Sequence, residues 1–447
     1  MCILGIFGVL PLLYYPSRVI IINKRGNRPQ APLSYRAKAT IILNCAQRAL
    51  KVKGFFMRNT KKLLKNLDWT FVALTLLILA YNIIILSSAS SNVLSSDPNF
   101  YVRRQLMWIG AGLFAGIVIA CFDYRRFRKF SWIIYALANL LLVAVLFSPE
   151  KKGAHRWFDL KFMDFQPSEL AKLVIIIAFA CFLYQRRDKL GRFYNWLFAL
   201  AYVGLPALLI LREPDLGTAL VFIVLFLVMC WIGGMPGRFV LTLLLLLCLG
   251  IALLFGALYV STDGYQHLPE ESPAFLPLEI YQVTRLVIFI NPYMDPLGAG
   301  YNMIQSEVAI GSGGLWGQGY GQGSQVQGYF LPEHHTDFIF SVVGEEFGFA
   351  GAIALIILYL LLLLRAIYIA ITAKDQLGST MVAGVAAMLA FQIFTNAGMT
   401  IGIMPITGIP LPLLSYGGSG MLVNLICLGL VVNVSMRRGK DHFFIEE

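Results

Sequence analysis

A carboxylate that could act as a general base stands at the edge of an apolar run. Asp337 follows the polar segment 333–336 and directly precedes the apolar segment 338–340. A carboxylate in this position is partly removed from water, and desolvation favours the form that holds a proton, which suits a base that accepts one from a hydroxyl group. The N-cap of a helix is the alternative, because Thr336 or Asp337 could accept a backbone N–H bond there without any catalytic function.

Glu169 and Lys172 form a second candidate group near the start of another apolar run. The two residues are three positions apart, so they share one face of a helix and can form an ion pair. A charged residue inside a membrane span costs about 2.5–3.5 kcal/mol on insertion scales, and such residues often mark functional sites. We expect this pair to bind substrate, with a structural ion pair near the membrane interface as the alternative.

Three further basic residues could bind an anion. Arg285 lies in a long polar connection at about 261–340, and its guanidinium could hold a diphosphate with two parallel hydrogen bonds. Lys152 and Arg156 lie in a connection that the charge distribution places outside the cell, where they could meet an anionic headgroup. For Arg285 an ordinary surface position remains the alternative.

Two other patterns in the long connection fit no familiar site. The glycines between 311 and 323 lack both a preceding strand and the GK[ST] sequence of a phosphate-binding loop, so we expect them to allow positive φ and close approach of the backbone to membrane or substrate. His334 and His335 are adjacent and therefore do not share a helix face, so surface positions are favoured over a metal-binding pair. Glu345 and Glu346, near the outer end of another predicted span, could simply reach the lipid headgroup layer.

The elements that position these residues are transmembrane helices. The 447 residues are 58% hydrophobic and only 13% charged, about half the charged content of a typical soluble domain. Segments that are apolar at every position, such as 241–247, favour helices over the alternating strands of a membrane β-barrel. We predict an all-α polytopic membrane protein of about ten transmembrane helices, with one large extracytoplasmic loop between helices seven and eight. The predicted spans are 69–90, 106–122, 131–148, 168–184, 195–211, 216–233, 239–260, 341–364, 379–402 and 410–434.

The distribution of Lys and Arg predicts the orientation of these helices. Basic residues cluster at 125–129, at 186–192 and at 437–440, and such clusters favour the cytoplasmic side of a membrane. We therefore expect both termini in the cytoplasm and the 261–340 loop outside it. The seven cysteines show no paired spacing, and most lie in apolar runs, so we predict free thiols.

The first 56 residues form a basic leader that differs from the rest of the chain. Residues 1–67 contain thirteen Lys or Arg residues, and the first acidic residue is Asp68. The leader could be a polybasic arm on the cytoplasmic leaflet, but we favour an over-extended start, with the membrane domain at 57–447. Because much of the excess positive charge lies in this leader, we expect no nucleic-acid partner.

Eight motifs in order, spread over about 69–438, resemble the SEDS family (shape, elongation, division and sporulation). The segment from 320 to 333 is more similar to the elongation branch, RodA, than to the division branch, FtsW. The motifs are 166–169 (QPSE), 213–218 (EPDLGT), 295–298 (DPLG), 305–306 (QS), 311–314 (GSGG), 335–340 (HTDFIF), 344–346 (GEE) and 410–419 (PLPLLSYGGS).

The resemblance implies a peptidoglycan glycosyltransferase in the bacterial cytoplasmic membrane. Such an enzyme polymerises lipid II into β-1,4 glycan at the outer face and releases undecaprenyl diphosphate. The resemblance also implies a class B penicillin-binding protein as partner. It places the essential aspartate of the family at Asp337 and the charged pair of its fourth span at Glu169 and Lys172.

Physical chemistry fits this assignment of functions. Asp337 would remove the proton of the acceptor 4-hydroxyl, while Arg285, Lys172 or a divalent cation would stabilise the diphosphate, with Lys152 and Arg156 as further substrate-binding residues. The main alternative activity is a lipid II flippase, since intramembrane charges also mark transport pathways. A non-catalytic scaffold for the transpeptidase is the third.

Overall fold

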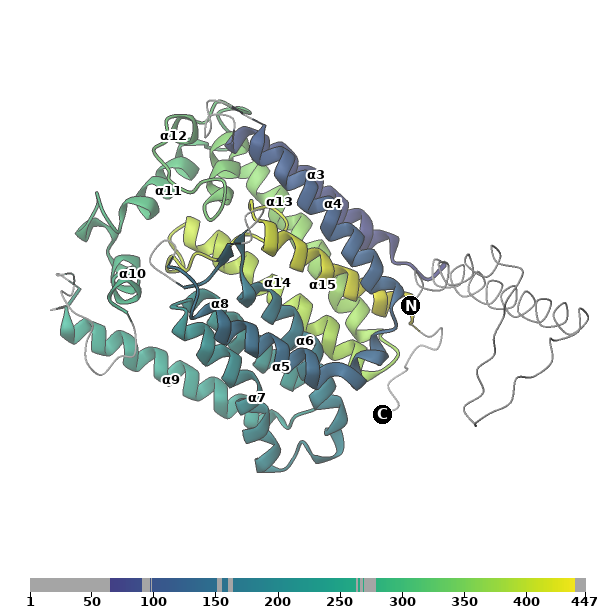
Figure 1. The fold of residues 1–447 in the computed structure, drawn as a ribbon. Coiled ribbons are helices and arrows are strands. Elements are labelled where there is room, and N and C mark those ends of the chain that lie inside the picture. The colour runs from purple at the N-terminus through teal and green to yellow at the C-terminus, as the bar shows by residue number, and fades with distance from the viewer. Residues whose placement is uncertain are drawn as a thin grey trace, which may run out of the picture. The chain divides into compact units, whose positions relative to one another are not determined.

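The computed structural model describes residues 65–90, 97, 99–150, 155–159, 164–262, 264–265, 268 and 279–438. The leader (1–56) and, separately, Lys152 lie outside these residues. The described part of the chain is almost entirely helical and confirms the predicted polytopic all-α fold (Figure 1). Ten long helices coincide with the ten predicted spans: α3 (Trp69–Ala89), α4 (Phe100–Cys121), α5 (Phe127–Val145), α6 (Pro167–Gln185), α7 (Phe193–Arg212), α8 (Leu216–Ile232), α9 (Gly237–Ser261), α13 (Ile339–Ile371), α14 (Gln376–Thr400) and α15 (Gly418–Met436).

The lengths of these helices match the thickness of a bilayer. Among the described residues, nine helical segments are long and apolar enough to cross a membrane, and α8, with 17 residues, is a shorter apolar helix. The two short runs at 168–184 and 195–211 form full helices of 19 and 20 residues. A helix of 20 residues extends about 30 Å, which is the thickness of the hydrocarbon core.

Polar residues at the helix starts explain where several spans begin. Asp68, Asp215 and Asp375 cap α3, α8 and α14, each accepting a backbone N–H at 2.9–3.1 Å. Pro167 occupies the first turn of α6, where its missing N–H would have no helical partner. Asp215 is therefore the N-cap of α8.

The predicted start of the last span was wrong. We expected helix from 410, but α15 begins at Gly418. Pro410 and Pro412 have no N–H to donate, and Leu413 has a positive φ of 63°, so the segment before α15 cannot continue a regular helix. This irregular segment runs past the candidate site described below.

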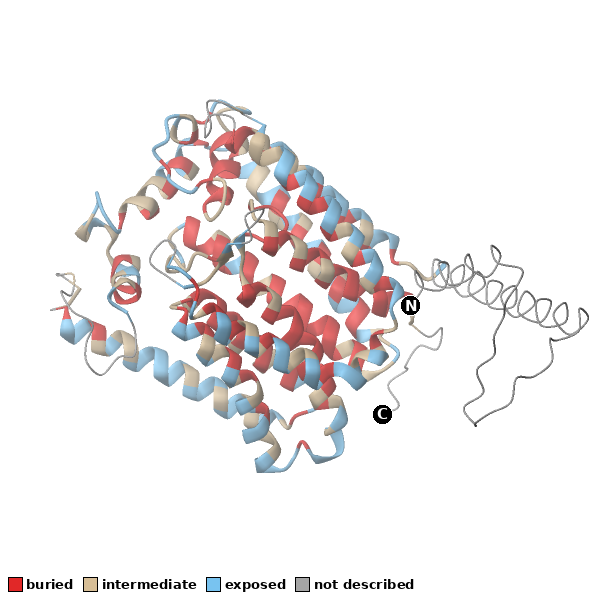
Figure 2. Ribbon diagram, in the orientation of Figure 1, coloured by how far each residue is buried: buried red, intermediate tan, exposed pale blue. Residues whose placement is uncertain are grey.

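The best-buried helices are α6, α14 and α15, which form the centre of the bundle (Figure 2). Their apolar windows are 72–83% buried, whereas the window of α9 is not buried at all. Helices α4 and α15 approach most closely at Gly116 and Gly429, where a Cβ on Gly429 would lie 2.4 Å from the carbonyl oxygen of Gly116. Small residues permit such close backbone packing between membrane helices.

The described part of the long connection between α9 and α13 contains three α-helices that were not predicted. They are α10 (Ile280–Ile290), α11 (Tyr301–Ser312) and α12 (Ser324–Gln327), and Figure 1 shows them together at one end of the bundle. A second unpredicted element is the hairpin of β1 (Phe158–Asp159) and β2 (Asp164–Phe165) before α6. Both connections supply residues to the candidate site.

The glycine-rich segment 313–323 is bound to a kink in α13. Gly348 has φ 65° and ψ −165°, so helical bonding is interrupted there. The carbonyls of Glu345 and Glu346 instead accept N–H bonds from Gln318 and Gly319 at 2.9 and 3.1 Å. Residues 349–371 alone are long enough to cross about 30 Å of hydrocarbon. The predicted positive φ is confirmed at Gly314, Gly317, Gly319 and Gly321, but the close backbone contact is made with α13 and not with membrane or substrate.

The prediction that Glu345 and Glu346 reach the headgroup layer was wrong, because both side chains are buried. Glu345 accepts hydrogen bonds from the backbone of Gln325 and Val326 at 2.7 and 3.2 Å, and Glu346 accepts one from Ser88. The bonds to Glu345 fix α12 to α13, and the bond to Glu346 joins α3 to α13.

Gly317→Ala is expected to destabilise the protein, because Gly317 has φ 82° and a Cβ there would lie 2.1 Å from the carbonyl oxygen of Glu346. We expect a loss of about 2 kcal/mol or more, measured as a lower melting temperature in detergent. Gly311→Ala is the matched control, since no atom lies within 4 Å of its added Cβ. Equal melting temperatures for the two variants would contradict the proposed packing.

Ion pairs link several helices at the end of the bundle where α3 and α14 begin and α13 and α15 end. Asp68 binds Arg365 of α13 and Arg438 after α15, each at 2.8 Å. Arg125 binds Asp375, which follows α13, at 2.8 Å. Arg125 and Arg438, from two of the predicted cytoplasmic clusters, therefore lie near the C-terminal end of α13, whereas Asp337 lies at its N-terminal end.

Candidate active site

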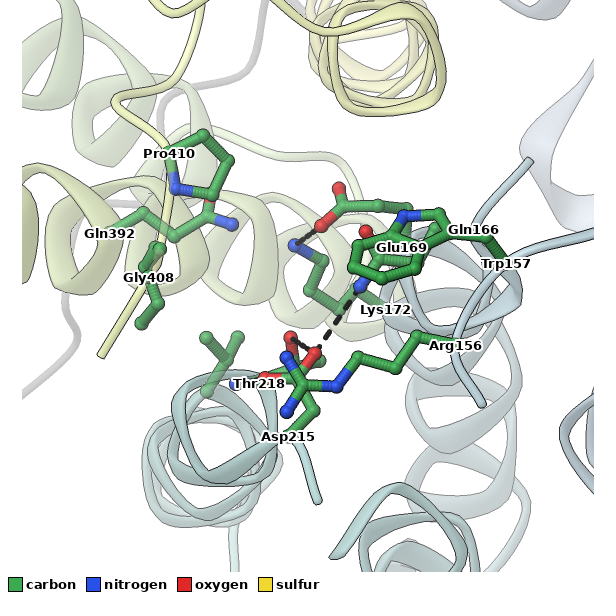
Figure 3. Close-up of a pocket in the computed structure, with 12 residues that line it drawn as sticks. Arg156, Trp157, Gln166, Glu169, Lys172, Asp215, Thr218, Gln392, Gly408 and Pro410 are labelled. Atoms are coloured by element: carbon green, nitrogen blue, oxygen red, sulfur yellow. Dashed lines mark hydrogen bonds and ion pairs between the residues drawn. The ribbon is translucent and has the colours of Figure 1, made fainter. Parts of the chain in front are cut away.

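A polar cavity lies between α6, the start of α8 and the segment before α15. Its lining includes Arg156, Glu169, Lys172, Asp215 and Gly408, drawn in Figure 3. A second cavity is lined by Arg156 and Asp215 again, together with Tyr281 and Arg285 of α10. The shared lining residues show that the two cavities adjoin each other.

Glu169 and Lys172 form the predicted ion pair inside the first cavity. Nζ of Lys172 donates to Oε1 of Glu169 at 2.7 Å, and both side chains are about 95% buried or more. A Cβ on Gly420, at the start of α15, would lie 3.6 Å from the second carboxylate oxygen of Glu169. A buried pair in contact with a polar cavity can present its charges to a ligand that enters the cavity.

Asp215 connects the residue before α6 to the start of α8. Its carboxylate accepts bonds from the backbone and hydroxyl of Thr218 at 3.0 and 2.9 Å and from Gln166 at 3.2 Å. Gln166 directly precedes α6, so this bond holds the N-terminal ends of α6 and α8 together (Figure 3).

Arg156 is held between the two cavities by backbone carbonyls. Its guanidinium donates to the carbonyl of Glu213 at 2.7 Å, to the carbonyl of Pro214 and to the hydroxyl of Tyr281 at 2.9 Å. Three acceptors fix the orientation of this long side chain in advance, which reduces the entropy lost when it binds an anion.

Asp337 and Arg285 both lie close to Gly408. A Cβ on Gly408 would lie 3.6 Å from Oδ2 of Asp337 and 3.9 Å from Nη1 of Arg285. Asn396 donates to the carbonyls of both Asp337 and Ile409, at 2.7 and 2.8 Å, and so fixes the Asp337 turn to the segment that carries Gly408. Phe338 is the N-cap residue of α13, so Asp337 precedes the capping position.

The structure thus brings together five of the six residues singled out from sequence. Glu169, Lys172 and Arg156 line the first cavity, Arg285 lines the second, and Asp337 lies beside Gly408. Lys152 lies outside the described residues. Sequence reasoning did not single out Gln392 and Asn396, although polar residues within the predicted span 379–402 were a signal for them.

The histidines differ from expectation. His334 is only 3% exposed, so the prediction of a surface histidine was wrong at this position. Its two ring nitrogens lie near backbone carbonyls, which compensate for the loss of water. Within the described residues no three His, Cys, Asp or Glu side chains are grouped to hold a metal ion, and the divalent cation stays a prediction.

Glu213, between α7 and α8, is a buried carboxyl group beside Arg156. Neither of its carboxyl oxygens accepts a hydrogen bond within the part of the chain that the structure describes. Burial and the neighbouring carboxylate of Asp215 raise the pKa of Glu213 to about 8, with Arg156 acting in the opposite direction. Glu213 is therefore protonated at neutral pH in the folded protein.

Glu213→Gln is expected to change how stability depends on pH. Between its usual pKa of 4.5 and about 8, Glu213 holds a proton only in the folded state, so the free energy of unfolding falls as pH rises through this range. The slope is at most about 1.4 kcal/mol per pH unit. Melting temperatures measured across the range should decline more steeply for the unchanged protein than for the variant, and parallel curves would contradict a protonated Glu213.

Comparison with known proteins agrees with the motifs. The family model described as "Cell cycle protein" (FTSW_RODA_SPOVE) matches residues 66–440, and the chain belongs to this family, which is the SEDS family that its motifs resemble. The chain is similar to "Peptidoglycan glycosyltransferase MrdB" of Escherichia coli, with 36% identity over 83% of this chain and 94% of that protein. It is 34% identical to "Peptidoglycan glycosyltransferase RodA" of Treponema pallidum over 83% of this chain and 98% of that protein.

Solved structures show the same fold. A chain from a structure titled "Structural coordination of polymerization and crosslinking by a peptidoglycan synthase complex" has a TM-score of 0.67 and 32% identity, covering 84% of this chain and 99% of that chain. RodA of Thermus thermophilus has a TM-score of 0.60 and 31% identity, covering 84% and 98%. The chain is thus a multi-pass membrane protein with the architecture of this family.

Proposed function

We propose that this chain is a peptidoglycan glycosyltransferase that polymerises lipid II at the outer face of the bacterial cytoplasmic membrane. Membership of a family whose curated members are named peptidoglycan glycosyltransferases supports the enzyme class. The observation that carries the proposal is the convergence of Arg156, Lys172 and Arg285 on two adjoining cavities whose edge, at Gly408, meets Asp337. Cations beside a carboxylate are what transfer from a sugar diphosphate needs.

The reaction is a single displacement at the donor sugar. The 4-hydroxyl oxygen of the acceptor attacks C1 of the donor, and the bond from C1 to the diphosphate oxygen breaks with inversion of the α-linkage to β. Asp337 accepts the hydroxyl proton, and the undecaprenyl diphosphate leaves with the electron pair of the broken bond. Arg156, Lys172 and Arg285 stabilise the negative charge that develops on the leaving group.

The order of the side chains suggests how the substrate lies. Asp337 and Arg285 both lie close to Gly408, which would place the attacking hydroxyl beside the aspartate and the diphosphate toward the cations. The prenyl chain of lipid II would remain between helices in the bilayer, so the substrate would enter from the side. The length of the prenyl chain makes passage through a closed cavity unfavourable.

The location and the partner belong to the same proposal. The position of the basic clusters at the C-terminal end of α13 supports an extracytoplasmic Asp337 and cytoplasmic termini in the inner membrane. The partner would be a single-pass class B penicillin-binding protein that crosslinks the new strand. The similar chain from a peptidoglycan synthase complex supports this partner.

The cellular role proposed is cell elongation and rod shape. The segment 320–333 supports the RodA branch. Sequence identity alone separates the branches little, because relatives named FtsW are 32–34% identical to this chain and those named MrdB are 36% identical. Depletion followed by microscopy separates the two branches. Rounded cells would support elongation, and filamentous cells would support division.

Labelled lipid II incubated with the purified protein and its partner tests the function. The proposal predicts a glycan polymer that muramidase digests. Translocated but unpolymerised lipid II would instead support the flippase, for which internal structural repeats would also be expected. Neither polymer nor translocation would support a non-catalytic scaffold.

A further inference from the structure

His334 is buried with both ring nitrogens facing backbone carbonyl oxygens. Nδ1 lies 2.7 Å from the carbonyl oxygen of Leu331, and Nε2 lies 2.8 Å from that of Ala89. The side chain is only 3% exposed. A carbonyl oxygen can only accept a hydrogen bond, so each of these two contacts requires an N–H on the ring.

A neutral imidazole cannot satisfy both contacts. It carries one N–H, and its other nitrogen would present a lone pair to a carbonyl oxygen at hydrogen-bond distance, which is repulsive. The imidazolium cation carries two N–H groups and donates to both oxygens. Hydrogen bonds from a charged donor are also stronger than neutral ones, which offsets part of the cost of burying the charge.

The position of Ala89 favours the cation independently. Ala89 is the last residue of α3, where carbonyl groups lack helical partners and the helix dipole is negative. A positive charge there satisfies one of these carbonyls and interacts favourably with the dipole. The helix end and the donor geometry therefore point to the same protonation state.

His334 also belongs to the turn that carries Asp337. The backbone N–H groups of Thr336 and Asp337 donate to the carbonyl of Glu333 at 3.1 Å each. Asn396 of α14 holds the carbonyl of Asp337 at 2.7 Å. The turn is thus attached to α14 at one end and, through His334, to α3 at the other.

We propose that His334 is held as an imidazolium and is a positioning residue that fixes the Asp337 turn to the end of α3. This inference deepens the proposed function and, for its effect on catalysis, rests on it. The rings of Tyr329 and His335 lie near His334, with ring centroids at 6.2 and 5.6 Å.

Two substitutions at position 334 distinguish a charged positioning residue from a neutral one. Glutamine carries one donor and one acceptor, like the neutral ring, so His334→Gln should lower kcat for lipid II by roughly 10- to 100-fold with little change in KM, because Asp337 is displaced. His334→Arg supplies only donors and should keep kcat within a few-fold of the unchanged protein.

The result that overturns the proposal is a His334→Arg variant that folds, judged by its melting temperature, yet is as inactive as His334→Gln. If both variants fail to fold, ¹⁵N spectra of the unchanged protein with labelled histidines distinguish the two protonation states. The ring signals of His334 show which of its nitrogens carry a bonded proton. Protons on both nitrogens at neutral pH support the proposal, and one proton refutes it. This measurement needs no turnover, so it stands apart from a failure of lipid II polymerisation.

Discussion

Asp337→Asn should reduce glycan synthesis from lipid II by at least about 100-fold while leaving the melting temperature and lipid II binding unchanged. The amide has nearly the same shape as the carboxylate but cannot accept the hydroxyl proton, and general base catalysis typically contributes 10²–10⁴-fold. The assay uses purified protein together with its transpeptidase partner. A loss in kcat without a rise in KM would place the defect in the chemical step.

Asp295→Asn is the matched control, because it makes the same change in the same long connection. The carboxylate of Asp295 accepts the backbone N–H of Ala299 at 2.8 Å, and an asparagine oxygen can do the same. Its activity should stay within about two-fold of the unchanged protein, since surface substitutions usually have small effects. Undiminished synthesis by Asp337→Asn would remove the aspartate from the mechanism.

Removing one member of the Glu169–Lys172 pair is expected to cause the largest loss of stability. The pair is buried and 2.7 Å apart, so Lys172→Met leaves the carboxylate of Glu169 charged and without its partner. Breaking a buried pair in this way costs about 3–5 kcal/mol. Thermal unfolding in detergent measures the loss, and Asp97→Asn, which breaks the exposed pair with Arg103, is the control with an expected cost below about 1 kcal/mol.

A double variant, Glu169→Leu with Lys172→Met, distinguishes the two functions considered for this pair. Replacing both charges by apolar groups of similar size is often neutral for stability, so the double variant should melt near the unchanged protein. If the pair binds substrate, the folded double variant should still fail to polymerise lipid II. Normal polymerisation by this variant would show that the pair is structural.

The fold was predictable because membrane spans depend on local hydrophobicity. All ten apolar runs form helices, and most boundaries agree within a few residues. The span predicted at 341–364 extends to 371 because Arg365, which reads as the end of an apolar run, is paired with the buried Asp68. That pairing joins residues almost 300 positions apart and leaves no local signal.

The site was predictable only in part. Residue type and local hydrophobicity marked Glu169, Lys172 and Asp337 individually, but their convergence with Arg285 depends on how α10 and the segment before α15 pack. Arg156 is oriented by backbone carbonyls, which have no sequence signature. His334 was assigned to the surface for the same reason, because the carbonyls of Leu331 and Ala89 that permit its burial are independent of residue type.

The side of the membrane that Asp337 faces tests the central claim most directly. Asp337→Cys and Lys189→Cys, made separately, are treated with a membrane-impermeant maleimide in right-side-out and inside-out vesicles, with the unchanged protein as the background for its native thiols. The cysteine at 337 should react in right-side-out vesicles and the cysteine at 189 only in inside-out vesicles. Reaction at 337 only in inside-out vesicles would contradict a base that acts on a sugar outside the bilayer.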